Sequence, residues 1–208
     1  MAIHESQSLF VEKQMAKSPE FWAWGLPLAR EHLGKDALPG WEIDDMLAHV
    51  HAIKPGFIRV DADEATYPLH IVLRFELEKD LVSGKLAAKD IPEVWDAKMR
   101  DYLGLSTRDN MKDGPMQDVH WPSGAFGYFP CYTLGAMYAA QWFAAMHTCV
   151  DVDASIDSGN LEPVFDWLRD NVWSQGSRWP TDELARRASG EALNPAHFRV
   201  HLERRYLA

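Results

Sequence analysis

The stretch 114-GPMQDVHWPSGAFGYFPCYTLGAMYAAQ-141 combines polar and aromatic side chains with four glycines. Glycine lets a backbone turn sharply or approach another segment closely. From Tyr132 onward, small and apolar residues recur at helical spacing. The stretch therefore predicts a polar, aromatic loop that leads directly into a buried helix, an arrangement in which a rigid element often presents functional side chains.

A purely structural interpretation of the same stretch is also open. Its Trp, Tyr and Phe side chains are of the types that fill protein cores. Asp118 and His120 can form a hydrogen-bonded pair that holds a turn before the helix. Composition alone does not separate this interpretation from a functional one.

The composition indicates a folded globular protein. The 208 residues include 47% hydrophobic side chains and nine tryptophans, enough for a sizeable core, and the formal net charge is −10. Phosphate binding favours a basic surface, so this charge argues against nucleic acid as a partner. The sequence has neither a membrane-spanning apolar run nor a secretion signal, so the expected location is the cytoplasm, with no membrane partner.

The two cysteines, Cys131 and Cys149, fall near the two ends of the expected long helix. On one helix they would lie about 27 Å apart, well beyond the reach of a disulfide. We therefore expect two buried, unpaired thiols.

Hydrophobic periodicity predicts an all-α, predominantly helical chain with at most one or two short strands, forming a single helical unit over residues 1–208. A short strand is expected at 57–60, where residue types alternate. The chain begins inside a helix without a capping residue, so it is expected to be cut from a longer protein. The expected helices begin near residue 3 and cover about 19–33, 43–53, 62–82, 91–103, 129–150 and 161–171, followed by two that begin at Thr181 and Asn194-Pro195.

Local signals define several helix ends. Ser18 before a proline predicts a capped helix start, and Asp90 with a glutamate three residues later predicts a capping box. Asp61 or Asp63 is expected to cap the helix that begins at residue 62. Pro68 is expected to kink the first turns of that helix.

Four segments, taken in chain order, resemble motifs of the thermostable carboxypeptidase family of zinc metallopeptidases, called M32. They are His4-Glu5-Ser6-Gln7 (its HES/GQ motif), Ile58-Arg59-Val60-Asp61-Ala62-Asp63 (its IRxxAD motif), GPMQDVHW at 114–121 (its GxxQDxHW motif) and GEALNP at 190–195. The chain is similar to less than half of such an enzyme, the C-terminal part. The HExxH, HPF and DxRxT segments, which lie upstream in the family, are absent from it.

The resemblance implies a helical, zincin-like, deep-cleft hydrolase that uses zinc, or sometimes cobalt, to release amino acids one at a time from peptides with a free C-terminus. It also implies a homodimer. In that family the HExxH helix supplies two zinc ligands and the general base, so this chain is expected to be inactive alone and to need an N-terminal, HExxH-bearing part. The alternative is a non-catalytic helical scaffold or interaction protein.

Glu5 corresponds to the family's glutamate ligand, so the resemblance implies that it binds the metal in a complete enzyme. A catalytic zinc needs three protein ligands and one open position, so Glu5 cannot hold the ion alone. His4 points about 100° away from Glu5 on a helix and is expected to pack or to support the site from outside the ligand shell.

Arg59 lies between the expected strand and a long helix, a fixed place from which a guanidinium can grip a carboxylate. The resemblance implies that Arg59 binds the free C-terminal carboxylate of the substrate. Gln117 and Asp118 are expected to position His120 or the substrate. The alternative is that Arg59 forms a structural ion pair with a nearby acid. The acids considered are Asp61, Asp63 and Glu64.

His120, Tyr128 and Tyr132 are the predicted catalytic residues. They are candidates for donating hydrogen bonds to the oxyanion that forms when zinc-activated water attacks the scissile carbonyl. The sequence does not distinguish between the two tyrosines.

His197 and His201 stand four residues apart on the expected last helix and therefore share a face, the spacing by which HExxH binds zinc. No glutamate follows the first histidine, so we do not expect a native metal site here.

Overall fold

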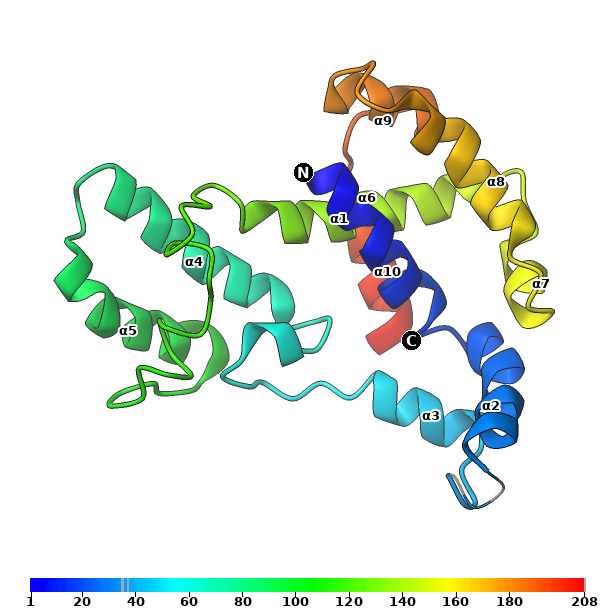
Figure 1. The fold of residues 1–208 in the computed structure, drawn as a ribbon, viewed down its shortest axis with the longest axis horizontal. Coiled ribbons are helices and arrows are strands. Elements are labelled where there is room, and N and C mark those ends of the chain that lie inside the picture. The colour runs from blue at the N-terminus through cyan, green and yellow to red at the C-terminus, as the bar shows by residue number, and fades with distance from the viewer. Residues whose placement is uncertain (35, 37, 208) are drawn as a thin grey trace. The chain divides into compact units, whose positions relative to one another are not determined.

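The computed structural model describes residues 1–34, 36 and 38–207, and the regular elements in these ranges are all helices, without a strand (Figure 1). The predicted all-α fold is therefore confirmed. The elements are α1 (Ala2–Leu9), the π-helix η1 (Phe10–Met15), α2 (Pro19–Leu33), α3 (Ile43–Val50), η2 (Arg59–Asp61), α4 (Tyr67–Val82), η3 (Ala88–Asp90), α5 (Ile91–Leu103), α6 (Pro130–Met146), α7 (Val152–Asp157), α8 (Glu162–Asn171), η4 (Trp173–Gln175), α9 (Thr181–Ser189) and α10 (Ala196–Tyr206).

The chain divides into two compact units. Unit 1 contains residues 1–2 and 52–134, and unit 2 contains residues 3–51 and 135–208. The boundary falls within α6, whose first turn belongs to unit 1 and whose remainder belongs to unit 2.

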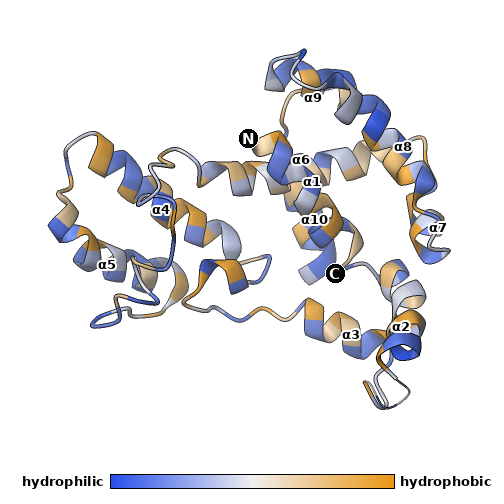
Figure 2. Cartoon of the chain, viewed as in Figure 1, coloured by the Kyte–Doolittle hydropathy of each residue, from blue (hydrophilic) through white to orange (hydrophobic). Residues whose placement is uncertain are grey.

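The core of unit 1 lies between α4 and α5, which pack side by side (Figure 1). Hydrophobic residues recur along both helices (Figure 2). Leu73 and Leu77 of α4 are completely buried against Trp95 and Met99 of α5. Trp121 from the following loop packs against the same cluster, so the core also positions that loop. Removal of such apolar surface from water stabilises the fold by about 25 cal/mol per Å².

In unit 2, α6 is a largely buried helix, and Trp142 and Met146 on it are inaccessible to solvent. Helix α1 crosses α6 at Gly135. A Cβ atom at Gly135 would lie 2.7 Å from the Cβ of Glu5, so only glycine allows the two helices to approach this closely. Elsewhere in this unit α2 contacts α3 and α7, and α7 contacts α8.

The N-terminal helix is not a uniform α-helix. After Leu9 it continues as the π-helix η1, in which Phe10 and Met15 are buried while Val11 is 43% exposed. Val11 reaches the surface between these buried residues because the wider π turn changes the direction of the side chains.

Two predictions about the start of α4 were wrong. Thr66 is the N-cap, and α4 begins at Tyr67 rather than residue 62. Asp63 instead accepts hydrogen bonds from the backbone N–H groups of Ala65 and Thr66 and so holds a turn before the helix. Pro68 consequently lies in the first turn of α4, where proline is tolerated without a kink.

Ser18 caps α2 as predicted, since its side chain accepts a hydrogen bond from the backbone N–H of Phe21. Asp90 makes no side-chain hydrogen bond at the start of α5 among the described residues, so the predicted capping box is wrong. Residues 57–60 are not a strand, because Arg59–Asp61 form the 3-10 turn η2.

Both cysteines are free thiols in the described part of the chain. Cys131 is half-buried, but Cys149 is exposed. The prediction of burial was wrong for Cys149 because α6 ends at Met146, four residues earlier than expected, and Cys149 lies in the turn after it.

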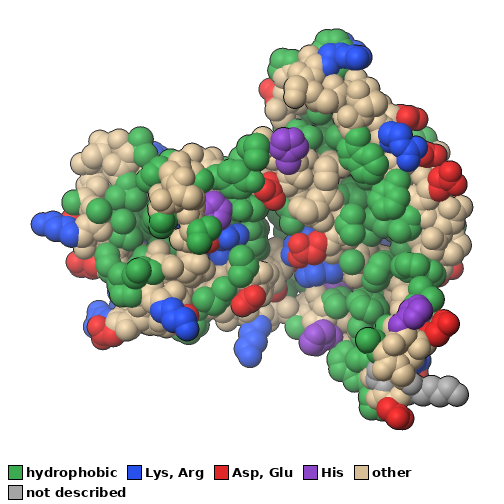
Figure 3. Space-filling model, viewed as in Figure 1, with side chains coloured by type: hydrophobic (Ala, Val, Ile, Leu, Met, Phe, Trp, Pro, Cys, Tyr) green, Lys and Arg blue, Asp and Glu red, His purple; other side chains and the backbone are tan. Residues whose placement is uncertain are grey.

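Hydrophobic side chains also reach the surface of both units (Figure 3). On α4, Val72, Phe75 and Val82 are 40%, 47% and 73% exposed. Among the described residues, no helix is both long and apolar enough to cross a membrane.

Candidate functional site

Arg59 and Asp118 form a buried ion pair in unit 1. Nε and Nη2 of Arg59 donate to Oδ1 of Asp118 at 2.9 and 2.7 Å, and Nη1 donates to the Tyr67 hydroxyl at 2.8 Å. Arg59 is 5% exposed. Its ionic partner is thus Asp118, in the GPMQDVHW loop, rather than any of the acids near Arg59 in the sequence.

A second arginine, which sequence analysis did not single out, binds the same carboxylate. Nε of Arg74 donates to Oδ2 of Asp118 at 2.6 Å, and its guanidinium lies 4.6 Å from the centre of the Trp95 ring. Arg74 is completely buried, although arginine on a helix is usually exposed. The available signal was its position on α4, three residues before the buried Leu77, which places both on one face.

The charges in this cluster do not cancel. Burial raises the pKa of Asp118, but the neighbouring charges of Arg74 and Arg59 outweigh this effect and hold the pKa below its ordinary value. Burial lowers the pKa of Arg74 to about 10, with Asp118 opposing, so Arg74 remains protonated at neutral pH. Two cations therefore share one anion in a buried place, which favours the approach of a second anion.

His120 and Tyr132 lie beside this ion pair. Nε2 of His120 and the Tyr132 hydroxyl share a hydrogen bond of 3.0 Å. Nδ1 of His120 is 3.8 Å from Oδ1 of Asp118, too long for a direct hydrogen bond. The Tyr128 ring lies 5.6 Å from the imidazole, and the Arg59 guanidinium lies 4.9 Å from the centre of the Tyr132 ring. The structure thus brings the three predicted catalytic residues together with Arg59 and Asp118.

Gln117 connects the two segments that carry this cluster. Its Nε2 lies 3.0, 2.7 and 3.1 Å from the carbonyl oxygens of Phe57, Asp113 and Gly114. Its Oε1 accepts a hydrogen bond from the backbone N–H of Arg59 at 2.8 Å. Gln117 therefore ties the loop to the backbone on both sides of Ile58.

Glu5 lies in unit 2, half-buried on α1. Its two neighbours in the motif hold the helix in place: Ser6 Oγ accepts a hydrogen bond from Nε1 of Trp142, and Gln7 Oε1 accepts one from Nε1 of Trp173. Together with the close contact at Gly135, these bonds fix the direction in which the Glu5 side chain leaves α1.

The GEALNP segment is bound to α6 through one side chain. Nε2 of Gln141 donates to Ser189 Oγ at 2.7 Å and lies 3.1 Å from the carbonyl oxygen of Ala192. Its Oε1 accepts a hydrogen bond from the backbone N–H of Asn194 at 2.9 Å. The segment therefore orders the connection between α9 and α10.

Within residues 1–34, 36 and 38–207, no group of three or more His, Cys, Asp or Glu side chains could hold a metal ion. A catalytic zinc takes three protein ligands, so the described residues do not fit such an ion by themselves. His197 Nε2 lies 2.8 Å from Oε1 of Glu191, whereas His201 Nε2 lies 3.3 Å from Nη1 of Arg205. His4 is exposed, so it does not pack within the described residues, and a supporting role near the metal stays a prediction.

The helical fold and the motif-bearing segments are those of a class of metallopeptidases. Residues 1–206 match the family model described as Carboxypeptidase Taq (M32) metallopeptidase. The chain belongs to this M32 family, which confirms the resemblance found in the sequence.

Relatives and solved structures agree with this assignment. The chain is 42% identical over 209 aligned residues to Thermostable carboxypeptidase 1 of Thermus thermophilus and 39% identical over 207 to Carboxypeptidase 1 of Bacillus subtilis. The alignments cover 100% and 99% of this chain but 40% and 41% of those proteins.

Among solved structures, Trypanosoma cruzi metallocarboxypeptidase 1 superimposes with a TM-score of 0.94 at 45% identity, over 100% of this chain and 43% of that one. The M32 carboxypeptidase from Deinococcus radiodurans gives a TM-score of 0.93 at 36% identity, over 99% and 41%. The chain therefore spans about two fifths of the length of the proteins it matches.

Proposed function

We propose that this chain acts as the C-terminal part of an M32-type zinc metallocarboxypeptidase. Residues 1–208 would serve together as a single helical part of that enzyme, and its substrates would be peptides with a free C-terminus. The proposal places the complete enzyme in the cytoplasm and makes it a homodimer. The observation that supports it best is the cluster of Arg59, Arg74 and Asp118, in which a buried positive charge is left over for a further anion.

Arg59 is the residue we assign to the substrate's C-terminal carboxylate. An arginine side chain has five N–H groups, and the described partners of Arg59 take three of them. Asp118 and Tyr67 hold the guanidinium in one orientation, so the remaining donors have a defined direction. Such preorganisation reduces the entropy lost when a carboxylate binds.

His120, Tyr132 and Tyr128 are assigned to the oxyanion that forms during peptide hydrolysis. The hydrogen bond between His120 and the Tyr132 hydroxyl couples the two donors, and Tyr128 packs beside the imidazole. Preorganised donors of this kind stabilise developing negative charge. Asp118 and Gln117 act by positioning these groups.

Glu5 is assigned to the metal in the complete enzyme. The residues that the structure describes do not fit a zinc ion by themselves, so the proposal requires an N-terminal, HExxH-bearing part to supply the other ligands and the general base. The fixed orientation of Glu5 against Gly135 supports a role that needs a defined side-chain direction.

The test starts with the chain purified without a histidine tag. Elemental analysis should find less than one tightly bound zinc per chain, and no amino acid should be released from a peptide with a free C-terminus. Addition of an N-terminal part that bears HExxH should produce zinc binding and turnover. Glu5→Ala should then abolish both, whereas Glu31→Ala, at an exposed position of α2, should change neither.

Two outcomes would contradict the proposal. Stoichiometric zinc and turnover by the chain alone would show that it does not depend on a further part. Absence of turnover after a stable complex with the N-terminal part has formed would favour the non-catalytic scaffold.

A further inference from the structure

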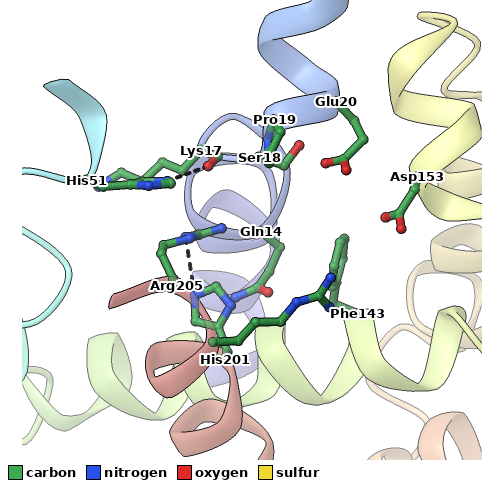
Figure 4. Close-up of a pocket in the computed structure, with 11 residues that line it drawn as sticks. Gln14, Lys17, Ser18, Pro19, Glu20, His51, Phe143, Asp153, His201 and Arg205 are labelled. Atoms are coloured by element: carbon green, nitrogen blue, oxygen red, sulfur yellow. Dashed lines mark hydrogen bonds between the residues drawn. The ribbon is translucent and has the colours of Figure 1, made fainter. Parts of the chain in front are cut away.

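Unit 2 contains a cavity of about 300 Å³ (Figure 4). It is formed where the end of η1, the first turn of α2 and the last turns of α10 meet α3, α6 and α7. A volume of this size is at the lower end of the range for small-molecule sites. The four segments that resemble M32 motifs do not include its lining residues.

The lining of the cavity carries charges of both signs. Lys17, Arg204 and Arg205 supply the positive charges, and Glu20 and Asp153 supply the negative ones. In Figure 4, the carboxylates of Glu20 and Asp153 lie on one side of the cavity, and Arg205 lies on the other. Asp153 also lies 3.6 Å from Nε2 of His147.

An amide donor in the lining lacks an acceptor. Gln14 is 2% exposed, and its Nε2 has no hydrogen-bond partner within residues 1–34, 36 and 38–207. A buried N–H group without a partner destabilises the fold, so the site favours a ligand that brings an acceptor. Figure 4 shows the Gln14 side chain reaching into the cavity from η1.

We propose that this cavity binds a free α-amino acid. The carboxylate would accept hydrogen bonds from Gln14 and Arg204, the ammonium group would face Glu20 and Asp153, and the side chain would lie along Phe143. A zwitterion satisfies both signs of charge at once. A simple anion would meet the two carboxylates without compensation, and a simple cation would meet the basic side chains.

The proposal is tested with three probes that have the same carbon skeleton. L-leucine carries both charges, L-leucinamide lacks the carboxylate, and 4-methylpentanoate lacks the ammonium group. In calorimetric titrations of the whole chain, we expect L-leucine to bind at least about tenfold more tightly than either analogue, because each analogue loses charge-assisted hydrogen bonds.

Substitutions of residues that line the cavity test whether L-leucine binds there. Arg204→Gln and Glu20→Gln should each weaken L-leucine about tenfold, and Gln14→Leu should do the same by removing the unpaired amide. Arg204 is exposed, so its replacement leaves the core intact. Arg199→Gln is the matched control, since Arg199 lies on the same helix, is exposed, and does not line the cavity.

Equal binding of L-leucine and L-leucinamide, or of L-leucine and 4-methylpentanoate, would overturn the proposal. So would absence of binding at tens of millimolar, or binding that Arg204→Gln and Glu20→Gln leave unchanged. Since binding is measured without turnover, these results do not depend on the proposed peptidase function. Under that function, the ligand would be of the same chemical class as the released product.

Discussion

Arg74 and Asp118 form an ion pair of 2.6 Å in which the arginine is completely buried. The other oxygen of the same carboxylate binds Arg59. One aspartate therefore compensates two buried cations that come from different elements, η2 and α4. Asp118 therefore contributes to the stability of unit 1 and, together with Tyr67, to the orientation of Arg59.

Replacement of Asp118 by alanine should lower the free energy of unfolding by about 3–5 kcal/mol, because two guanidinium groups would lose their buried partner. Urea denaturation of the purified chain measures this change. Asp61→Ala is the control, since Asp61 lies in the IRxxAD segment but is exposed, and its effect should stay within about 0.5 kcal/mol. Similar effects of the two substitutions would mean that the ion pairs do not stabilise the fold.

The Arg59→Ala variant tests whether Arg59 recognises the substrate or has only a structural role. In the complete enzyme, we expect this variant to lose at least about tenfold more kcat/KM on a peptide with a free C-terminal carboxylate than on the same peptide with a C-terminal amide, because only the former presents the charge that Arg59 binds. Equal losses on both peptides would assign Arg59 a structural role.

Acidification should destabilise unit 1 through His70. Burial, followed by the charges of Arg74 and Arg59, lowers the pKa of His70 from 6.5 to about 4. Between these values the unfolded chain binds a proton that the folded chain does not. The free energy of unfolding should therefore fall by up to roughly 3 kcal/mol as the pH drops from 6.5 toward 4.

Urea denaturation of the His70→Gln variant across this pH range tests whether His70 causes the loss of stability. The variant should show a smaller loss of stability on acidification than the parent chain, whereas His32→Gln, at an exposed position, should leave the slope unchanged. Asp118 acts in the same direction at lower pH: its pKa is held below 3.8, so the stability it contributes is lost only as the pH falls below that value.

Gly135→Ala should destabilise unit 2 by about 1–3 kcal/mol, because the new methyl group would overlap the Cβ of Glu5 and push α1 away from α6. Thermal unfolding followed by circular dichroism measures the effect. Gly25→Ala offers a matched comparison within α2. Its Cβ would meet the Phe21 ring at 3.4 Å, an ordinary contact, so this variant should be neutral or more stable by up to about 1 kcal/mol. If both substitutions changed the stability in the same direction, the result would argue against the close crossing of α1 and α6.

The isolated chain should self-associate. Apolar side chains of α4, including Val72, Phe75 and Val82, are exposed, and burial of apolar surface yields about 25 cal/mol per Å². Light scattering at tens of micromolar should detect dimers or larger species. Val82→Glu, at the most exposed of these three positions, should reduce the association. A monodisperse monomer would show that these surfaces do not drive contact between copies.

Local sequence signals were sufficient for much of the fold. Periodicity located α5 at its observed boundaries, and Ser18 marked the start of α2 because its cap depends only on the next three residues. The alternation at 57–60 was misleading, since so short an alternating segment can also enter a 3-10 turn, as Arg59 and Val60 do. Asp90 is the N-cap residue of α5, but its side chain makes no capping hydrogen bond within the described residues, because the motif permits such bonds but does not require them.

The candidate site depended on contacts that no local pattern contains. The sequence predicted roles for Arg59 and Asp118 separately. They are 59 residues apart, and their pairing is a property of the tertiary structure. Arg74 belongs to no motif in the sequence, and its spacing from Leu77 does not show that it is completely buried. Tyr132 shares a hydrogen bond with Nε2 of His120, because its position at the start of α6 carries its hydroxyl to the imidazole.

The π-helix at 10–15 has the same effect as one residue inserted into an α-helix. Deletion of a single residue there would restore α-helical hydrogen bonding and rotate the preceding turns by about 100° relative to those that follow. Glu5 lies before this segment and Gln14 lies near its end. The number of residues in the segment therefore determines the angle about the helix axis between the side chain of the proposed metal ligand and the amide of the cavity. A one-residue deletion in this segment should therefore disturb both groups together.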